Sequence, residues 1–152
     1  RDLKLMRNNP KKTISYKLFE DAALKNSTSS ELANTNFTVT AKKGMSEREV
    51  WQRLMNISIS NFQNIAVKDE AAGWIRTAWI MHSYDNQIIR TRLEVQKQFA
   101  GDGVFAYRAK LSSEIADREC GTSDQCFSAY NRVLKTYSSV ISELQTTVGS
   151  NF

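Results

Sequence analysis

Three alternating runs of apolar and polar residues, separated by short turns, constrain this chain more than any other feature. They are GWIRTAWIM (73–81), QIIRTRLEVQKQF (87–99) and GVFAYRAKL (103–111). Alternation with a period of two is typical of strands that bury one face. Turns this short allow only antiparallel pairing between consecutive strands. The runs therefore predict an antiparallel sheet in the second half of the chain.

Two amphipathic segments flank this sheet and predict helices. Ser46 and Glu49 have the spacing of a capping box, so a helix is expected over residues 47–61. Apolar residues recur at threes and fours from Phe127 to Val148, which predicts one long C-terminal helix.

Two further strands are expected, over residues 37–41 and 65–67. The expected fold class is then α+β, in the order β-α-β-β-β-β-α. It consists of an antiparallel sheet of about four to five strands with the helices packed on one face.

The chain is expected to divide at residue 34. Residues 1–45 contain nine Lys/Arg and four Asp/Glu, whereas residues 46–152 contain twelve of each. Residues 1–34 are predicted to be a flexible basic leader or tether, and residues 35–152 a single domain. The basic residues of the leader are too sparse for a polybasic clamp, so no nucleic-acid partner is expected.

The alternation sorts the basic residues of the sheet onto one face. Arg90 and Arg92 lie opposite the apolar positions of the second run, and Arg76 and Arg108 hold polar positions in the neighbouring runs. Such a patch can bind a carboxylate, a phosphate or an acidic protein surface. The alternative is a solvated face on which Glu94 and Glu114 act as cross-strand partners.

Two tryptophans have opposite parity in the first run. In a regular strand, Trp74 and Trp79 cannot both face the core, so one of them should be exposed, covered at an edge or placed in a groove. Together with the four arginines they are the candidate partner-binding residues. The alternative is that a helix or the leader covers the outward-facing tryptophan.

Cys120 and Cys126 enclose the turn-forming sequence GTSDQ, and this spacing predicts a structural disulfide. A disulfide would place the protein in an oxidising compartment. Two free thiols or a redox pair are the alternatives, although C-x5-C is not the usual redox spacing. No metal site is expected, because no further cysteine and only one histidine are present.

No catalytic constellation is apparent. His82 stands beside Ser83 and Asp85 in a predicted turn, whereas a catalytic triad needs residues that converge from different elements. We therefore expect neither an enzyme nor a cofactor.

The order of these elements resembles the helix-grip domains of bacterial envelope lipoproteins. It is similar in pattern to the small lipoprotein subunit of the outer-membrane β-barrel assembly machinery. The residues that carry the resemblance are Gly73, Trp74, Ile75, Thr77 and Trp79, followed by Arg90 and Arg92. The resemblance implies an envelope protein that is tethered by a lipid, binds partners and performs no chemistry.

The expected function is therefore that of a non-enzymatic binding or scaffold module, periplasmic or associated with the outer membrane. It would contact protein partners through the exposed sheet face and a membrane only through an N-terminal lipid anchor. The alternative is a carrier of a small apolar ligand, with a cavity between the sheet and the C-terminal helix. The residues expected to discriminate these functions are Trp51, Trp79, Phe105, Tyr130 and Tyr137.

Overall fold

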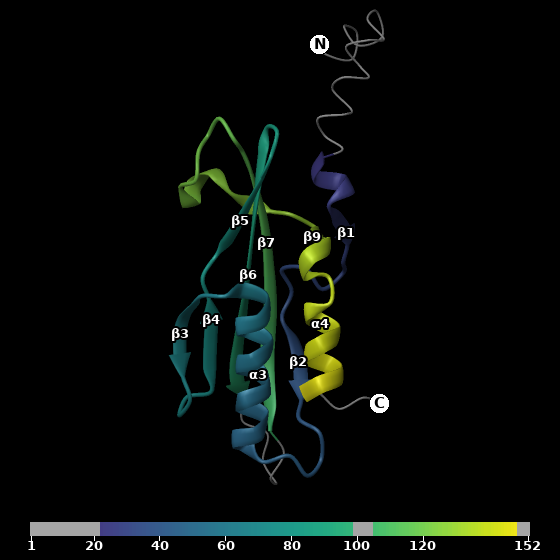
Figure 1. Ribbon diagram of the computed structural model, residues 1–152, viewed down its shortest axis with the longest axis vertical. Coiled ribbons are helices and arrows are strands. Elements are labelled where there is room, and N and C mark those ends of the chain that lie inside the picture. The colour runs from purple at the N-terminus through teal and green to yellow at the C-terminus, as the bar shows by residue number, and fades with distance from the viewer. Residues whose placement is uncertain (1–21, 99–104, 149–152) are drawn as a thin grey trace, which may run out of the picture.

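A computed structural model describes residues 22–98 and 105–148 of the chain. It is an α+β fold in which a large antiparallel sheet carries its helices on one face (Figure 1). The strands are β1 (Ser27–Ser29), β2 (Phe37–Thr40), β3 (Ile65–Asp69), β4 (Trp74–Thr77), β5 (Ile80–Tyr84), β6 (Gln87–Gln98), β7 (Ala106–Asp117), β8 (Ser128–Ala129) and β9 (Arg132–Leu134). The helical elements include α3 (Glu47–Phe62), α4 (Val140–Glu143) and its continuation η3 (Leu144–Val148), with the short turns η1 (Asp124–Cys126) and η2 (Lys135–Tyr137). Residues 22–25 are also helical.

The main sheet is built around the pairing of β6 with β7, which runs from Gln87↔Asp117 to Gln98↔Ala106. Strand order is β2-β7-β6-β4-β3, while β5 pairs with the first half of β6 and β8 pairs with β7. A second, small sheet consists of β1 and β9. The predicted α+β class is confirmed, but the described residues contain more strands than the four to five expected. The turn expected between the second and third alternating runs, at residues 100–103, lies outside the described residues.

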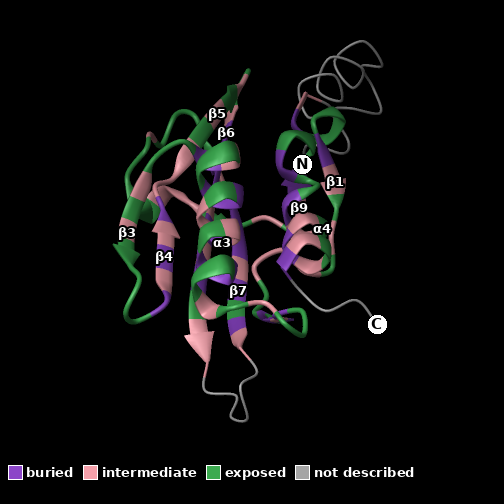
Figure 2. Ribbon diagram, turned by 60° about the horizontal axis from the view of Figure 1, so that its bottom comes forward, coloured by how far each residue is buried: buried purple, intermediate pink, exposed green. Residues whose placement is uncertain are grey.

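The two faces of the sheet differ as the alternation predicted. Ile89, Leu93 and Val95 of β6 are fully buried on the inner face, together with Tyr107 and Leu111 of β7. Helix α3 covers this face, with its buried residues toward the sheet and exposed residues on its opposite side (Figure 2). The even-numbered residues of β6 lie on the outer face.

Helix α3 begins as the sequence predicted. Ser46 Oγ accepts a hydrogen bond of 3.1 Å from the backbone N–H of Glu49. The reciprocal half of the capping box is absent from the hydrogen bonds of the described residues, and the Glu49 carboxylate pairs instead with Arg53, one turn later.

The predicted C-terminal helix is wrong for most of its length. Continuous helix occupies only Val140–Val148, and the preceding residues form the single 3-10 turns η1 and η2 and the strands β8 and β9. The apolar stripe that suggested one helix is divided between two surfaces. Phe127 packs against Arg90 on the outer face, whereas Tyr137 stacks on Phe62 of α3 with ring centroids 5.0 Å apart. A helical period alone cannot distinguish such a divided stripe from one continuous face.

The predicted leader boundary at residue 34 is also too late. Strand β1 pairs with β9, and Ala23 is only 2% exposed. Arg132 fixes this segment by donating from Nε to Ser27 Oγ (2.9 Å) and from Nη2 to the Ser27 carbonyl (2.7 Å). Residues 22–34 are therefore packed against the domain. Residues 1–21 of the predicted leader lie outside the described residues.

Asn34 connects three segments that are distant in the sequence. Its side-chain amide donates to the carbonyls of Ser113 (3.0 Å) and Tyr130 (2.9 Å) and accepts from the backbone N–H of Ser113 (2.9 Å). Its backbone φ of 61° lies in the left-handed region, which asparagine tolerates better than most residues. One side-chain amide thus supplies a partner to the Ser113 N–H and to the Tyr130 carbonyl, and it adds a second donor to the Ser113 carbonyl, which also accepts from the Tyr130 N–H.

We predict that Asn34→Ala lowers the free energy of unfolding by about 2–4 kcal/mol, because partly buried backbone groups lose their partners. Urea denaturation would measure this change. Asn36→Ala is the control, since Asn36 is exposed two residues away and should leave the stability unchanged. Equal stability of the two variants would contradict the role assigned to Asn34.

Candidate functional site on the outer sheet face

Both candidate tryptophans lie on the outer face of the sheet. In a regular strand they would have faced opposite sides, because one is even-numbered and the other odd-numbered. Arg76 pairs with Glu94 but Ile80 pairs with Thr91, so the chain has one extra residue between β4 and β5. Thr77 accommodates this bulge, because its Oγ1 accepts a hydrogen bond of 3.0 Å from the Leu93 N–H. A bulge of one residue reverses the parity that follows it.

Arginine side chains stack on these two indoles. Arg92 lies 4.3 Å and Arg90 4.1 Å from the centroid of the Trp79 ring, and Arg76 lies 5.7 Å from that of Trp74. These distances are within the range of cation–π attraction. The Trp74 Nε1–H also donates to Glu94 Oε2 at 2.8 Å. The four residues Trp74, Arg76, Trp79 and Arg92 are called the Trp–Arg surface below.

Arg90 has a different environment from the other arginines. It is only 6% exposed, and its guanidinium lies between the rings of Trp79 and Phe127, at 4.1 and 4.0 Å. Its Nη2 lies 2.7 Å from Glu114 Oε1, and its Nη1 lies 2.8 Å from Asp124 Oδ1. Arg90 therefore holds η1 and Phe127 against the sheet.

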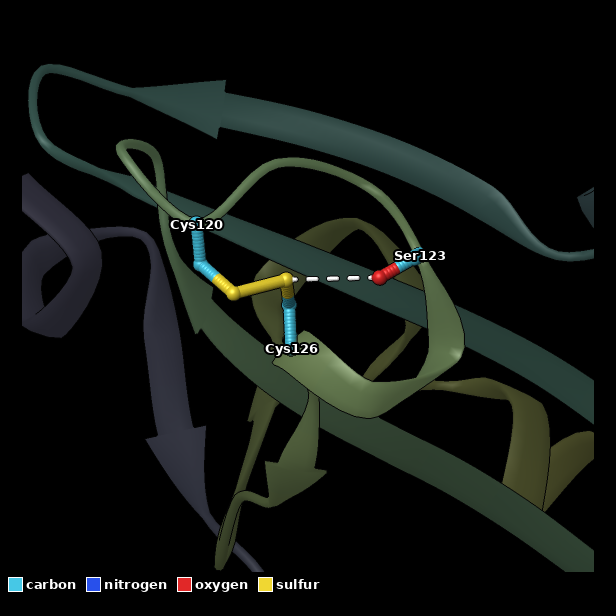
Figure 3. The surroundings of a disulfide bond; sticks show 3 residues. All are labelled: Cys120, Ser123 and Cys126. Carbon is cyan, nitrogen blue, oxygen red and sulfur yellow. Dashed lines mark hydrogen bonds between the residues drawn. A yellow bond between two sulfur atoms is a disulfide. The ribbon is translucent and has the colours of Figure 1, made fainter.

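The segment that Arg90 holds is closed by the predicted disulfide. Cys120 and Cys126 are bonded, and Ser123 Oγ lies 3.5 Å from Cys126 Sγ (Figure 3). Asp124 lies inside the closed loop and Phe127 directly follows it. The covalent bond and the Arg90 contacts thus restrain the same segment.

The structure places all six predicted partner-binding residues on one face. Arg108 is exposed and lies opposite Gln96 on the β7 side of this face. Arg90 differs from the other five because it is buried and its guanidinium N–H groups already bind Glu114 and Asp124, so it is not accessible to a partner. The sequence predicted Glu114 as a cross-strand partner. It did not predict the contacts of Phe127, which was assigned to the C-terminal helix, or of Asp124, which precedes that segment.

The pKa of Arg92 is lowered, first by its partial burial and then by the positive charge of Arg76. Glu94 and Glu114 act in the opposite direction. The guanidinium remains charged at neutral pH, because arginine begins from a very high pKa. The lowered pKa of Arg92 therefore reflects its burial on the outer face first and the neighbouring positive charge of Arg76 second.

His82 lies on β5 rather than in the turn predicted for residues 82–86. Its Nε2 is 2.9 Å from the Tyr137 hydroxyl, on the inner face of the sheet. Strand alternation directs Ser83 to the opposite face, and Asp85 is exposed at the hairpin tip. These three residues do not converge. Within residues 22–98 and 105–148, no group of three His, Cys, Asp or Glu side chains could hold a metal ion.

The cavities lined by described residues include the following two. One, of about 490 Å³, is lined by Glu47, Arg48, Trp51, Glu70, Ala71, Lys97 and Tyr107. The other, of about 190 Å³, is lined by Ala23, Leu24, Gln87, Ile115 and Tyr130. Neither includes a residue of α4 or η3. Four charged side chains line the larger cavity, and burial, followed by the charge of Glu47, raises the pKa of Tyr107 to about 12.

Compared with known proteins, the chain matches no family model and no curated protein. None of the helices among the described residues is both long enough and apolar enough to span a membrane. The fold and the outer face are therefore the basis for any functional assignment.

We predict that Arg90→Lys lowers the free energy of unfolding by about 2 kcal/mol. Lysine keeps the charge but loses the planar contact with both rings and the fork of donors. Urea denaturation would measure the loss, with Arg108→Lys as a control at an exposed position of the same face. If Arg90→Lys is as stable as the unaltered chain, Arg90 does not hold the disulfide loop as described.

Proposed function

We propose that this chain is a non-enzymatic binding or scaffold module of the cell envelope, which contacts a protein partner through the outer sheet face. The observation that carries this proposal is the Trp–Arg surface. The hydrophobic core lies on the other face, so the core does not require tryptophans and arginines at these positions.

The composition of the Trp–Arg surface supports a protein partner. Tryptophan and arginine are enriched among the residues that dominate binding energy at protein interfaces. Trp74 and Trp79 are both half-buried, and each ring is already oriented by a stacked arginine. Side chains that are ordered before binding lose less entropy when a partner arrives.

The proposed location is periplasmic or associated with the outer membrane. Disulfides persist in oxidising compartments, and Cys120 and Cys126 are bonded. The resemblance to helix-grip envelope lipoproteins suggests the same location and a lipid anchor. Its strand motif, from Gly73 to Arg92, is present here as consecutive strands, although the C-terminal helix is short.

The inner face supports a binding module over a carrier. Val140, Leu144 and Val148 are fully buried where the C-terminal helix packs, and Tyr137 stacks on Phe62. Of the five residues chosen to discriminate the two functions, Trp51 alone lines the larger cavity, beside charged groups. Trp79 lies on the opposite face of the sheet.

Site-specific photo-crosslinking in the producing cell would test the proposal. Benzoylphenylalanine would replace Gln96 or Ser83, which are exposed on the outer face, or Ser60, which is exposed on α3. We expect Gln96 or Ser83 to yield an adduct with one defined protein, and Ser60 to yield none. Such an adduct should disappear when Trp79→Ala is added, since the proposed contact includes that ring.

Adducts of equal yield from the α3 position would contradict the proposal, as would their absence from both outer-face positions. Thermal unfolding of each labelled chain would establish that the substituted protein is folded.

A further inference from the structure

Two neighbouring arginines of the Trp–Arg surface have no carboxylate partner among the described residues. Arg76 and Arg92 take part in none of the ion pairs formed within 4.0 Å by these residues. We infer that this pair binds carboxylate side chains of an acidic segment of the partner protein. The inference rests on the proposed function and specifies the chemistry of the partner.

Three acidic residues of the outer face already have other partners. Glu94 accepts the indole N–H of Trp74, while Glu114 and Asp124 both pair with Arg90. The sheet register places Arg76 opposite Glu94, yet no ion pair joins them. None of these three carboxylates therefore forms an ion pair with Arg76 or Arg92, although Glu94 and Glu114 partly offset the positive charge of Arg92.

The register also places the two arginines near one another on the outer face. Arg76 lies opposite Glu94, and Arg92 is two residues from Glu94 on the same face of β6, so the arginines are diagonal neighbours. Diagonal neighbours in an antiparallel pair lie about 7–8 Å apart, within reach of long side chains. The pKa of Arg92 is lowered first by burial and then by the charge of Arg76, and this second cause agrees with their proximity. A carboxylate bound between them would offset the repulsion and accept charge-assisted hydrogen bonds.

Trp79 prepares Arg92 for such a ligand. The guanidinium lies over the indole ring at 4.3 Å, a contact that restricts its orientation. Stacking uses the face of the planar guanidinium and leaves N–H donors at its edge, where bidentate carboxylate contacts form. The stacked tryptophan thus adds an apolar wall beside the charged groups.

The mixed charge of the outer face favours a protein over a uniformly anionic surface. Glu94, Glu114 and Asp124 lie among the arginines and would repel closely spaced phosphates of a membrane or a nucleic acid. A protein segment can place its carboxylates opposite Arg76 and Arg92 alone. Arg108 and Lys110 on β7 would extend the contact, since Lys110 lies opposite Glu94.

Fluorescence anisotropy with a labelled peptide of alternating Glu and Thr would test the inference on the full chain. We expect R76Q/R92Q to weaken binding at least about tenfold, as befits two lost charge-assisted contacts. The control K42Q/K43Q removes the same net charge from two exposed residues before α3 and should change the affinity less than about twofold. A peptide with Gln in place of Glu should bind more weakly than the acidic peptide.

Three outcomes would overturn the inference. One is equal weakening by the two double variants, which would indicate net charge alone. Another is the absence of any acidic-peptide binding. The third is binding of phosphatidylglycerol vesicles or inorganic phosphate, but not of the peptide, that R76Q/R92Q abolishes. Any of these would leave the proposed function standing if cross-linking still finds a protein on the outer face. Loss of the cross-link with intact peptide binding would instead contradict the proposed function.

Discussion

The pairing of β6 with β7 is the constraint on which the rest of the structure depends. Because side chains alternate along this ladder, its register determines at once which residues form the core and which face outward. Leu93 and Leu111 are opposite each other in the core, and Arg90 and Glu114 are opposite each other outside. A slip of one residue would bury the arginines and expose the leucines, so the hydrophobic core also fixes the Trp–Arg surface.

Arg90 connects this ladder to the segment that follows it. Its buried guanidinium would be costly without partners, and Glu114, Asp124 and two aromatic rings provide them. One of these partners, Glu114, is also a carboxylate that acts on the charge of Arg92. Arg90 therefore both holds the following segment on the sheet and occupies two carboxylates of the outer face. The partner-binding role of the surface remains a proposal, whereas the structural role of Arg90 follows from its contacts.

Local signals in the sequence predicted much of this fold. Ser46 specified the start of α3, the alternation along β6 separated core from surface, and the spacing of Cys120 and Cys126 indicated their bond. Three features escaped prediction because they depend on tertiary contacts. The bulge before Trp79 is stabilised by the Thr77 side chain. Strand β1 is a polar Ser-Thr-Ser segment held by Arg132. Phe127 packs against Arg90 on the outer face of the sheet. For the candidate site, the sequence predicted the residue types and the face that they share. It did not predict that Arg90 is buried in ion pairs within the chain.

The central claim is that the outer face is covered by a partner in the cell, and hydroxyl-radical footprinting tests it most directly. Oxidation of Trp74 and Trp79 would be compared between the purified chain and the chain in its native cell envelope, with core Trp51 as the internal reference. The account predicts that both outer-face tryptophans are protected in the envelope while oxidation of Trp51 is unchanged. Equal oxidation of Trp74 and Trp79 in the two settings would contradict it.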